Sequence, residues 1–381
     1  MHKRERARSS WPWPYPRWQR WLIELVSLAV ILGLLALAVT TVRDSLRAQQ
    51  IASGFGFLQR EAGFAIAETP IAYSPADSYA RAIAVGLVNT VRVSLPALFG
   101  ATVLGVLLAV ALRSAQPLAR RGARVYVECF RNTPLLLQLF LWYALLTTLL
   151  PPPRQAWQPL AAVFVSNRGL YLPVPLEPGP WLWALAVAVA SLIAALRLRG
   201  RLLHTRRRGR LLAPLALFAL PVLATLWLGD ASAGLSQPVL RGFNFVGGTV
   251  LTPEFAALGL GLTLYSASYI AEIVRGGIDA VPAGQREAAL AVGLTPVQAL
   301  RLVLLPQAVR VALPPYAGQA LSLIKNSSLA VAIGYPDLLS IASTTINQTG
   351  QAIEGIAIVM AAYLSVNLAV AGLIALWGRG R

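Results

Sequence analysis

The sequence REAALAVGLTPVQALRLVLLPQ, residues 286–307, is charged and rich in alanine, in a chain that is otherwise mostly apolar. This stretch and the turn before it contain residues that commonly begin or end helices: Pro282, Gly293, Thr295, Pro296, Gln298 and Pro306. Glycine takes the left-handed turn after a helix at low cost, and Thr-Pro-x-Gln is typical of a capping box that begins the next helix. We therefore expect two short helices that meet at a sharp angle near Gly293 and stop at Pro306, too short to cross a bilayer.

The composition of the whole chain is that of a membrane protein. Hydrophobic residues make up 56% of the 381 residues, charged residues only 13%, and the mean hydropathy is +0.62. Soluble domains carry about 25% charged residues, and several apolar runs reach the roughly 20 residues that a membrane-spanning helix needs. We expect an all-α polytopic membrane protein with eight spans, at roughly 21–42, 84–112, 126–150, 181–198, 211–228, 254–274, 312–334 and 356–377.

The basic residues orient these spans. Eight spans place both termini on one side, and 23 lysines and arginines lie on that side against seven in the opposite loops. Because loops rich in Lys and Arg stay in the cytoplasm, both termini and the predicted helix pair are expected there. The net charge of +18 then reflects topology and contact with membrane lipids rather than a nucleic-acid partner. His2, His204 and Cys129 are isolated, so no metal site or internal disulfide is expected.

The first helix of the predicted pair has little side-chain bulk, because Ala288, Ala289 and Ala291 follow Glu287. Small side chains allow a helix to approach another surface closely, which suits docking into a groove of a partner protein. The alternative is an amphipathic helix that rests on lipid headgroups. Such a helix needs large apolar side chains on one face, and the abundance of alanine favours docking.

The segment EAALAVGLTPVQALRLVLLP, residues 287–306, resembles the EAA loop of ABC importer permeases, with Val303 where that family usually has isoleucine. The segments SYIAEIVRGGIDAVPAGQ, LIKNSSLAVAIGYPDLLS and YVECFRNTPLLLQLFLWY are similar to the polar amino-acid uptake branch, which includes histidine and glutamine permeases. The similarity covers roughly 84–150 and 254–377. The added first span, the middle insertion and SNRGLYLP at 166–173 resemble general L-amino-acid permeases.

This resemblance implies a type I ABC importer permease with a five-helix core and amino acids, broadly polar ones, as substrates. The residues that match the family's ATPase-coupling loop are Glu287, Ala288, Ala289, Gly293 and Pro306. It also implies a separate ABC ATPase subunit, a second homologous permease in a heterodimer, a periplasmic amino-acid-binding protein and a place in the bacterial inner membrane. The sequence has no Gly-x-x-x-x-Gly-Lys phosphate loop. We therefore expect no cofactor and no enzymatic activity in this chain, with ATP and Mg²⁺ bound by the partner ATPase.

On this basis the chain divides into a five-helix core and added segments. In order these are a cytoplasmic basic N-terminus (1–20), an extra first span (21–42), a periplasmic segment (43–83), the first part of the core (84–150), an insertion with two extra spans (151–253), the second part of the core (254–377) with the coupling loop (282–306), and a cytoplasmic tail (378–381). The insertion therefore interrupts the core once.

Polar residues within spans are costly in a bilayer and are candidates for a substrate pathway. Those selected are Asn89, Arg92, Arg131, Asn132, Lys325, Asn326, Ser327 and Ser328. The Lys325 ammonium, well inside its span, is suited to a substrate carboxylate; a structural lysine paired with a buried acid or with backbone carbonyls is the alternative. Arg92 either lines an outer vestibule or extends toward lipid headgroups.

Two charged pairs are expected to be structural. Glu128 and Arg131 are three residues apart on one helix and can pair. Glu272 and Arg275 lie at the cytoplasmic end of their span and are expected to anchor the coupling loop.

An ATP-independent secondary transporter or channel is the alternative function. It would need ion-coupling acids in the middle of spans, whereas the acids of this sequence lie near the predicted span ends. A membrane-bound enzyme fits less well, because the sequence offers no histidine cluster, no paired intramembrane acids and no nucleophile motif.

Overall fold

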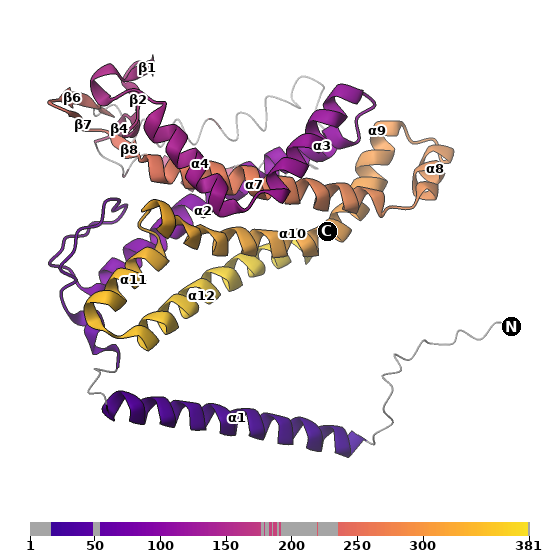
Figure 1. Cartoon of the computed structure of the whole chain (residues 1–381). Helices are drawn as coiled ribbons and strands as arrows, with labels where there is room; N and C mark the ends of the chain where they lie inside the picture. Colours follow the sequence, from indigo (N-terminus) through magenta and orange to yellow (C-terminus); the bar gives the residue numbers. More distant parts are fainter. Residues whose placement is uncertain are drawn as a thin grey trace.

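The computed structural model describes residues 17–48, 54–176 and 235–379, together with isolated residues between 179 and 219. Long helices lie side by side in a bundle, with small sheets at one end and a helical corner at the other (Figure 1). We refer to the end with the strands as the sheet end and to the end with α8 and α9 as the loop end. Helix α1, Arg17–Ala48, stands apart from the bundle (Figure 1), and none of its apolar stretch is buried.

The remaining helices are α2 (Tyr79–Leu112), α3 (Pro117–Asn132), α4 (Leu135–Thr148), α7 (Pro253–Asp279), α8 (Ala283–Ala291), α9 (Pro296–Ala299), α10 (Leu305–Asn326), α11 (Leu338–Thr349) and α12 (Ala352–Arg379). Short 3₁₀ segments are η1 (Phe55–Gln59), η2 (Pro153–Gln155) and η4 (Ser327–Ile333), and η3 (Leu300–Leu304) is π-helical.

Five stretches of the described chain are long and apolar enough to cross a membrane: Trp21–Ala38, Tyr79–Leu112, Pro253–Asp279, Pro296–Ile333 and Ala352–Leu376. The prediction of a helical polytopic membrane protein is therefore confirmed. The predicted spans at 181–198 and 211–228 lie outside the described residues, so the total of eight stays a prediction.

Glycines allow α7 to pack closely against α2 and α4 at the centre of the bundle. A Cβ added to Gly105 of α2 would lie 2.7 Å from Cγ2 of Ile270, and one added to Gly261 of α7 would lie 2.5 Å from Cδ2 of Leu139. The side chains of Leu258 and Leu262 are fully buried in the same core. Small residues at helix crossings are the usual means of close packing within a membrane, where lipid leaves little hydrophobic driving force.

The predicted span at 126–150 is divided into two helices by an irregular turn, which the sequence Asn132-Thr133-Pro134 predicts. Helix α3 ends at Asn132 and α4 begins at Leu135, with Thr133 in an extended conformation between them. Pro134 explains the break, because proline disfavours helical geometry in the residue before it. The side-chain amide of Gln138 then donates to the carbonyls of Phe130 and Thr133, both at 3.0 Å, in place of the missing helical bonds.

The predicted stop at Pro306 is wrong, because the helical chain continues past it. Segment η3 is π-helical and leads directly into α10, where Pro306 occupies the first turn. A proline has no amide hydrogen to donate to the preceding turn, and the wider π turn just before it absorbs the change of register. The second helix of the pair is therefore continuous with a membrane-spanning helix, Pro296–Ile333.

Both ends of the 151–253 insertion form strands that the sequence analysis did not predict. A four-stranded antiparallel sheet has the order β1 (Trp157–Leu160), β2 (Val163–Ser166), β3 (Gly169–Leu172) and β8 (Thr249–Leu251). Two smaller sheets pair β4 (Val174–Pro175) with β5 (Leu235–Ser236), and β6 (Val239–Arg241) with β7 (Asn244–Val246). Because β8 ends just before α7 begins, the sheet fixes the start of α7.

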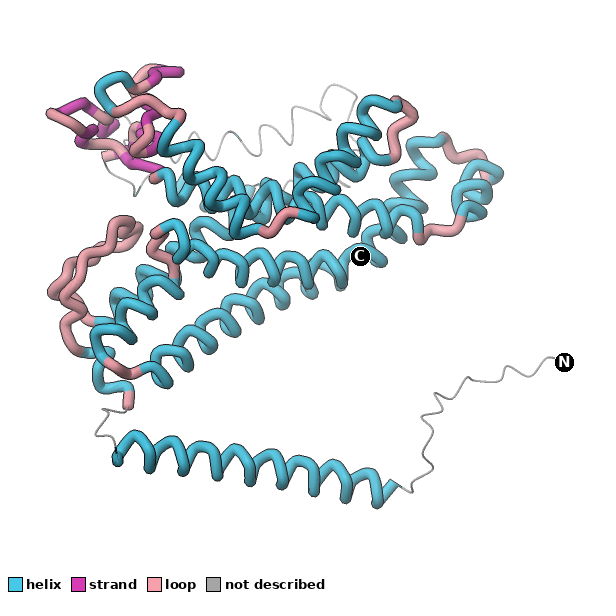
Figure 2. Tube along the Cα trace, in the orientation of Figure 1, coloured by secondary structure: helices cyan, strands magenta, loops and turns pink. Residues whose placement is uncertain are grey.

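Residues 54–78, named here the connecting segment, run along the sheet end. Beyond the short 3₁₀ segment η1 they are mostly loop (Figure 2). Its Phe57 and Ala62 are 1% and 2% exposed and pack with Tyr79 of α2 and with Leu338 and Ile341 of α11. The connecting segment is therefore part of the folded core rather than a free linker.

Candidate functional site

The corner between α8 and α9 has the sharp turn that its sequence predicts. Gly293 has a φ of +86°, which favours glycine, and its amide donates to the carbonyl of Leu290 at 3.0 Å. Thr295 caps α9: its hydroxyl accepts from the amide of Gln298 at 3.3 Å, and Oε1 of Gln298 accepts from the amide of Thr295 at 2.9 Å. The predicted turn and capping box are both confirmed.

The surface of this corner combines charged and apolar side chains. Glu287 and Ala288 are exposed, whereas Ala289 of α8 and Ala299 of α9 are 4% and 1% exposed inside the corner. Large apolar side chains are exposed beside them, namely Leu290, Val292, Val297, Leu300 and Leu302. An exposed apolar patch of this kind is typical of an interaction surface. Pro306 does not belong to the corner, since it lies in the first turn of α10.

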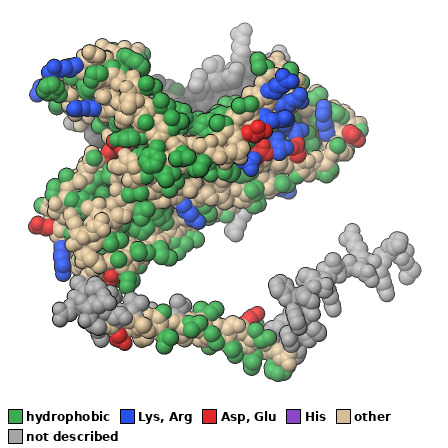
Figure 3. All heavy atoms as spheres, in the orientation of Figure 1, with side chains coloured by type: hydrophobic (Ala, Val, Ile, Leu, Met, Phe, Trp, Pro, Cys, Tyr) green, Lys and Arg blue, Asp and Glu red, His purple; other side chains and the backbone are tan. Residues whose placement is uncertain are grey.

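Charged side chains tie the end of α7 to its neighbours close to the corner. Arg275 pairs with Glu272 at 2.6 Å and with Asp279 at 2.9 Å, and Arg113, which follows α2, pairs with Asp279 as well. Figure 3 shows basic and acidic side chains gathered toward the loop end, while apolar side chains cover the middle of the bundle. These ion pairs join the end of α7 to the residue after α2, and none of them includes a described residue of α8 or α9. The role of Glu272 and Arg275 as anchors of the coupling loop therefore stays a prediction.

A polar cavity of about 510 Å³ lies between α3 and α7 at the same end. Its lining includes two of the candidate pathway residues, Arg131 and Asn132, together with Glu128. The predicted pair of Glu128 with Arg131 is not formed, since no ion pair in the described part of the chain includes Glu128. The guanidinium of Arg131 instead lies 5.3 Å from the ring centre of Tyr269 on α7.

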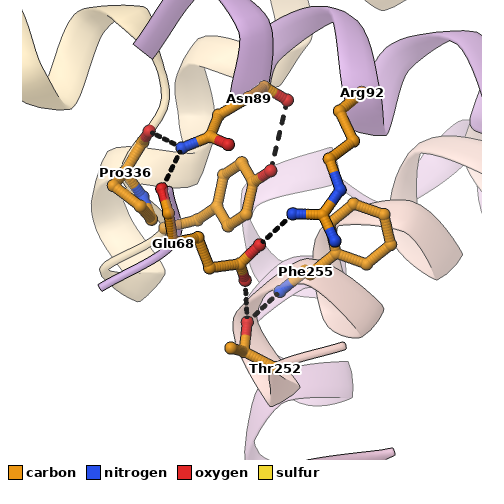
Figure 4. Close-up of polar contacts among 7 residues, drawn as sticks. Glu68, Asn89, Arg92, Thr252, Phe255 and Pro336 are labelled. Atoms are coloured by element: carbon orange, nitrogen blue, oxygen red, sulfur yellow. Dashed lines mark hydrogen bonds and ion pairs between the residues drawn. The ribbon is translucent and has the colours of Figure 1, made fainter. Parts of the chain in front are cut away.

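The sheet end holds a buried cluster around Asn89 and Arg92 (Figure 4). Asn89 is fully buried, and its side-chain nitrogen donates to the backbone carbonyls of Glu68 and Pro336, both at 2.9 Å. The hydroxyl of Tyr335 donates to the carbonyl of Asn89 at 3.2 Å. Asn89 therefore joins α2 to the connecting segment and to the turn after η4.

Glu68 is the acidic partner in this cluster. Nη1 of Arg92 lies 2.9 Å from Oε2 of Glu68, with 30% and 4% of the two side chains exposed. The hydroxyl of Thr252 donates to Oε1 of Glu68 and accepts from the amide of Phe255 at 3.1 Å, as the N-cap of α7. The ring centre of Phe255 lies 5.1 Å from the Arg92 guanidinium (Figure 4). Arg92 therefore does not extend toward headgroups.

Burial raises the pKa of the Glu68 carboxyl, and the negative charge of Glu254 adds to the rise. The Thr252 hydroxyl and the Arg92 guanidinium act in the opposite direction but do not cancel the effect of burial. Glu68 is not among the residues predicted from the sequence, although one signal points to it: it is the single acid in the apolar run FAIAETPIAY, residues 64–73.

The Lys325 group lies at the junction of α10 and η4. Lys325 and Ser328 line a mostly apolar cavity of about 640 Å³ against α12. The hydroxyls of Ser327 and Ser328 donate to carbonyls of their own helix, both at 2.7 Å. No ion pair within the described ranges involves Lys325, so the alternative of a lysine paired with a buried acid is not supported.

The structure thus distributes the predicted pathway residues over three places. Asn89 and Arg92 meet at the sheet end, Arg131 and Asn132 line the cavity at the loop end, and Lys325 and Ser328 line the cavity against α12. A single site that includes all eight is not formed. The candidate residues lie instead at different positions along the length of the bundle.

Comparison with known proteins gives consistent matches. The family described as binding-protein-dependent transport system inner membrane component matches residues 101–380. Three relatives cover nearly the whole chain. They are the putative amino-acid ABC transporter permease protein YhdX of Escherichia coli (42% identical; 99% of this chain, 98% of the relative), the general L-amino acid transport system permease protein AapQ of Rhizobium johnstonii (39%; 93% and 90%), and the glutamate/glutamine/aspartate/asparagine transport system permease protein BztB of Rhodobacter capsulatus (35%; 94% and 92%).

Proposed function

The chain belongs to the binding-protein-dependent transport system inner membrane components, and from this premise we propose that it is the permease subunit of an ATP-driven ABC importer of amino acids. The observation that carries the proposal is the exposed corner of α8 and α9 at one end of an apolar, membrane-spanning bundle. Membership of the family makes the chain a multi-pass inner membrane protein. The alternative of an ATP-independent transporter or channel gains no support from any feature of the fold.

The corner is the proposed contact with a separate ATPase subunit. Its exposed Leu290, Val292 and Val297 supply apolar area for a groove, and the capped turn at Gly293 holds that area at a fixed angle. Helix α9 continues through η3 into α10, so a push on the corner acts directly on a spanning helix. Glu287, Ala288 and Gly293 belong to this contact, and Ala289 supports it from inside the corner. ATP and Mg²⁺ are expected in the ATPase, and none is expected in this chain.

This contact also orients the chain. With the corner in the cytoplasm, the sheet end and the connecting segment face the outside, where a binding protein delivers its ligand. The excess of basic residues on the loop-end side supports this orientation. A second homologous permease is the expected neighbour of the bundle, since exposed apolar side chains such as Phe99, Leu364 and Leu368 cover its sides.

The substrate class follows from the relatives and from the polar side chains of the bundle. Relatives that cover nearly the whole chain are described as permeases for general L-amino acids and for glutamate, glutamine, aspartate and asparagine. Arg92, Arg131 and Lys325 supply positive charge at three levels of the bundle, which suits substrates that all carry a carboxylate. We therefore assign a broad set of L-amino acids, acidic and amide ones included.

The test uses Gly293→Trp in cells that express the whole system. Because a tryptophan side chain is bulky and does not favour the positive φ of this position, the variant is expected to lose uptake of radiolabelled glutamine while the permease remains in the membrane. Gly122→Trp is the matched control, because Gly122 on α3 also has open space around its Cβ but has no positive φ. Recovery of a phosphate-loop ATPase with the tagged wild type, and loss of it from Gly293→Trp alone, supports the coupling role. Normal uptake by Gly293→Trp would overturn it.

A further inference from the structure

One acidic side chain of the connecting segment, that of Glu68, is buried against the bundle. Glu68 is 6% exposed, and its carboxylate binds Arg92 of α2 and Thr252 at the start of α7. Its backbone carbonyl binds Asn89. Through one residue the segment is attached to the two helices that form the centre of the bundle (Figure 4).

The Arg92 guanidinium has capacity for a second ligand. It bonds to Glu68 through Nη1 alone, and no other hydrogen-bond partner occurs for it among the described residues. A guanidinium carries five N–H donors, and 30% of this side chain is exposed. Paired, two-bond contact with a carboxylate is the strongest arrangement open to arginine, and Glu68 does not use it.

Holding the connecting segment in place is not a sufficient reason for the ion pair between Glu68 and Arg92. The segment is already held by the buried Phe57 and Ala62 and by backbone bonds from Ala62 to Asp77 and from Tyr79 to Arg60, at 2.8 and 3.0 Å. A buried ion pair seldom adds stability over apolar side chains of the same shape. The upward shift of the pKa of Glu68 agrees, since it means that the carboxylate is held there at a cost.

We infer that Arg92 is a binding site for the carboxylate of the transported amino acid, and that Glu68 occupies this site while the sheet end is closed. Every amino-acid substrate carries the group that Glu68 presents, so a substrate that arrives at Arg92 competes with Glu68. Displacement removes the charged link between the connecting segment and α2 and α7, which couples arrival of substrate to release of the segment. This inference rests on the proposed function, because it takes an amino acid as the substrate.

The test uses the complete transporter, with its ATPase and permease partners, in proteoliposomes without a binding protein. Glu68→Gln keeps the shape of the side chain and a hydrogen-bond acceptor for Thr252 but removes the charge that pairs with Arg92. We expect basal ATPase activity to rise about five-fold, and L-glutamine, but not its C-terminal carboxamide analogue, to stimulate it further. Adding Arg92→Gln to this variant is expected to abolish the preference for the free carboxylate. This pair of changes leaves no unpaired buried charge.

Two controls separate a carboxylate site from a structural role. Glu61→Gln removes an exposed acid from the same segment and is expected to behave as wild type. Glu68→Asp keeps the charge and is expected to restore low basal activity at least in part. Unchanged basal activity in Glu68→Gln, with normal folding by thermal unfolding, would overturn the competition. Equal response to glutamine and its carboxamide in Glu68→Gln would overturn the site at Arg92. Uptake of glutamine by the wild-type system tests the proposed function separately.

Discussion

The two ends of the bundle use charge in opposite ways. At the sheet end Glu68 and Arg92 form a buried pair that joins the connecting segment to α2 and α7. At the loop end Arg275, Glu272 and Asp279 form pairs whose side chains are 27% to 42% exposed, beside a corner that leaves its apolar side chains uncovered. The difference is that the ion pair of the sheet end is buried within this chain, whereas the loop end leaves apolar side chains exposed, as a contact with a partner requires. Substitutions at the two ends should therefore differ in kind.

The largest difference should appear on removal of one charge from the buried pair. Arg92→Ala leaves the Glu68 carboxylate buried without its cation, and we expect a loss of about 3–5 kcal/mol in the free energy of unfolding. Thermal unfolding of the purified chain in detergent measures this loss. The double variant Glu68→Gln/Arg92→Ala should recover part of it, since no buried charge is left unpaired. A loss below about 1 kcal/mol in Arg92→Ala would mean that water reaches Glu68.

A pH-dependent effect is expected next at the same end. Burial raises the pKa of Asp337, the N-cap of α11, from 3.8 to about 6. The hydroxyl of Tyr363 donates to Oδ2 of Asp337 at 3.3 Å, and the amide of Ser340 donates to Oδ1 at 2.9 Å. Because the raised pKa lets the folded state hold the proton longer than the unfolded state, this group's contribution is complete at low pH. This contribution to the free energy of unfolding is lost as pH rises from about 4 to about 6, and the loss amounts to at most about 3 kcal/mol.

Unfolding temperatures measured between pH 4 and pH 7 test this expectation. In the wild type the amide of Ser340 donates to Asp337 at 2.9 Å, and Asp337→Asn keeps an acceptor for this bond. This variant should show a smaller fall in unfolding temperature as pH rises. The exposed Glu61→Gln should leave the decline as in the wild type. An equal slope in Asp337→Asn would assign the pH dependence to other groups.

At the loop end the backbone should matter more than charge. Gly293→Ala adds a methyl group where φ is +86° and nothing lies within 4 Å of the new Cβ, so only conformational strain is introduced, about 1 kcal/mol. Gly284→Ala, in the first turn of α8 and equally open, should be neutral or slightly stabilising. We expect uptake to fall several-fold in Gly293→Ala and not in Gly284→Ala. Equal uptake in both would show that the angle of the corner is not critical.

What the sequence predicts follows the same division between the ends. The corner at the loop end depends on neighbours in sequence, Gly293 followed by Thr295 and Gln298, so local patterns suffice to predict it. The cluster at the sheet end joins residues 184 positions apart, such as Glu68 and Thr252, which no local pattern connects. The continuation of the helix through Pro306 shows a further difficulty, whereas the break at Pro134 follows the local sequence. A proline interrupts a helix or begins one, and the choice depends on where the adjacent turns find hydrogen-bond partners.

The smallest effect is expected from the exposed pairs of the loop end. Arg275→Ala removes contacts to Glu272 and Asp279, whose side chains are 27% and 42% exposed, and should cost at most about 1 kcal/mol. Because water and salt screen such pairs, this cost should disappear at high ionic strength. The loss in Arg92→Ala should persist under the same conditions, since Glu68 is shielded from solvent. Unfolding of both variants at low and high salt therefore compares the two ends directly. If the two losses of stability were equally sensitive to salt, the sheet end would be open to solvent and Glu68 would be free to leave Arg92 without a substrate.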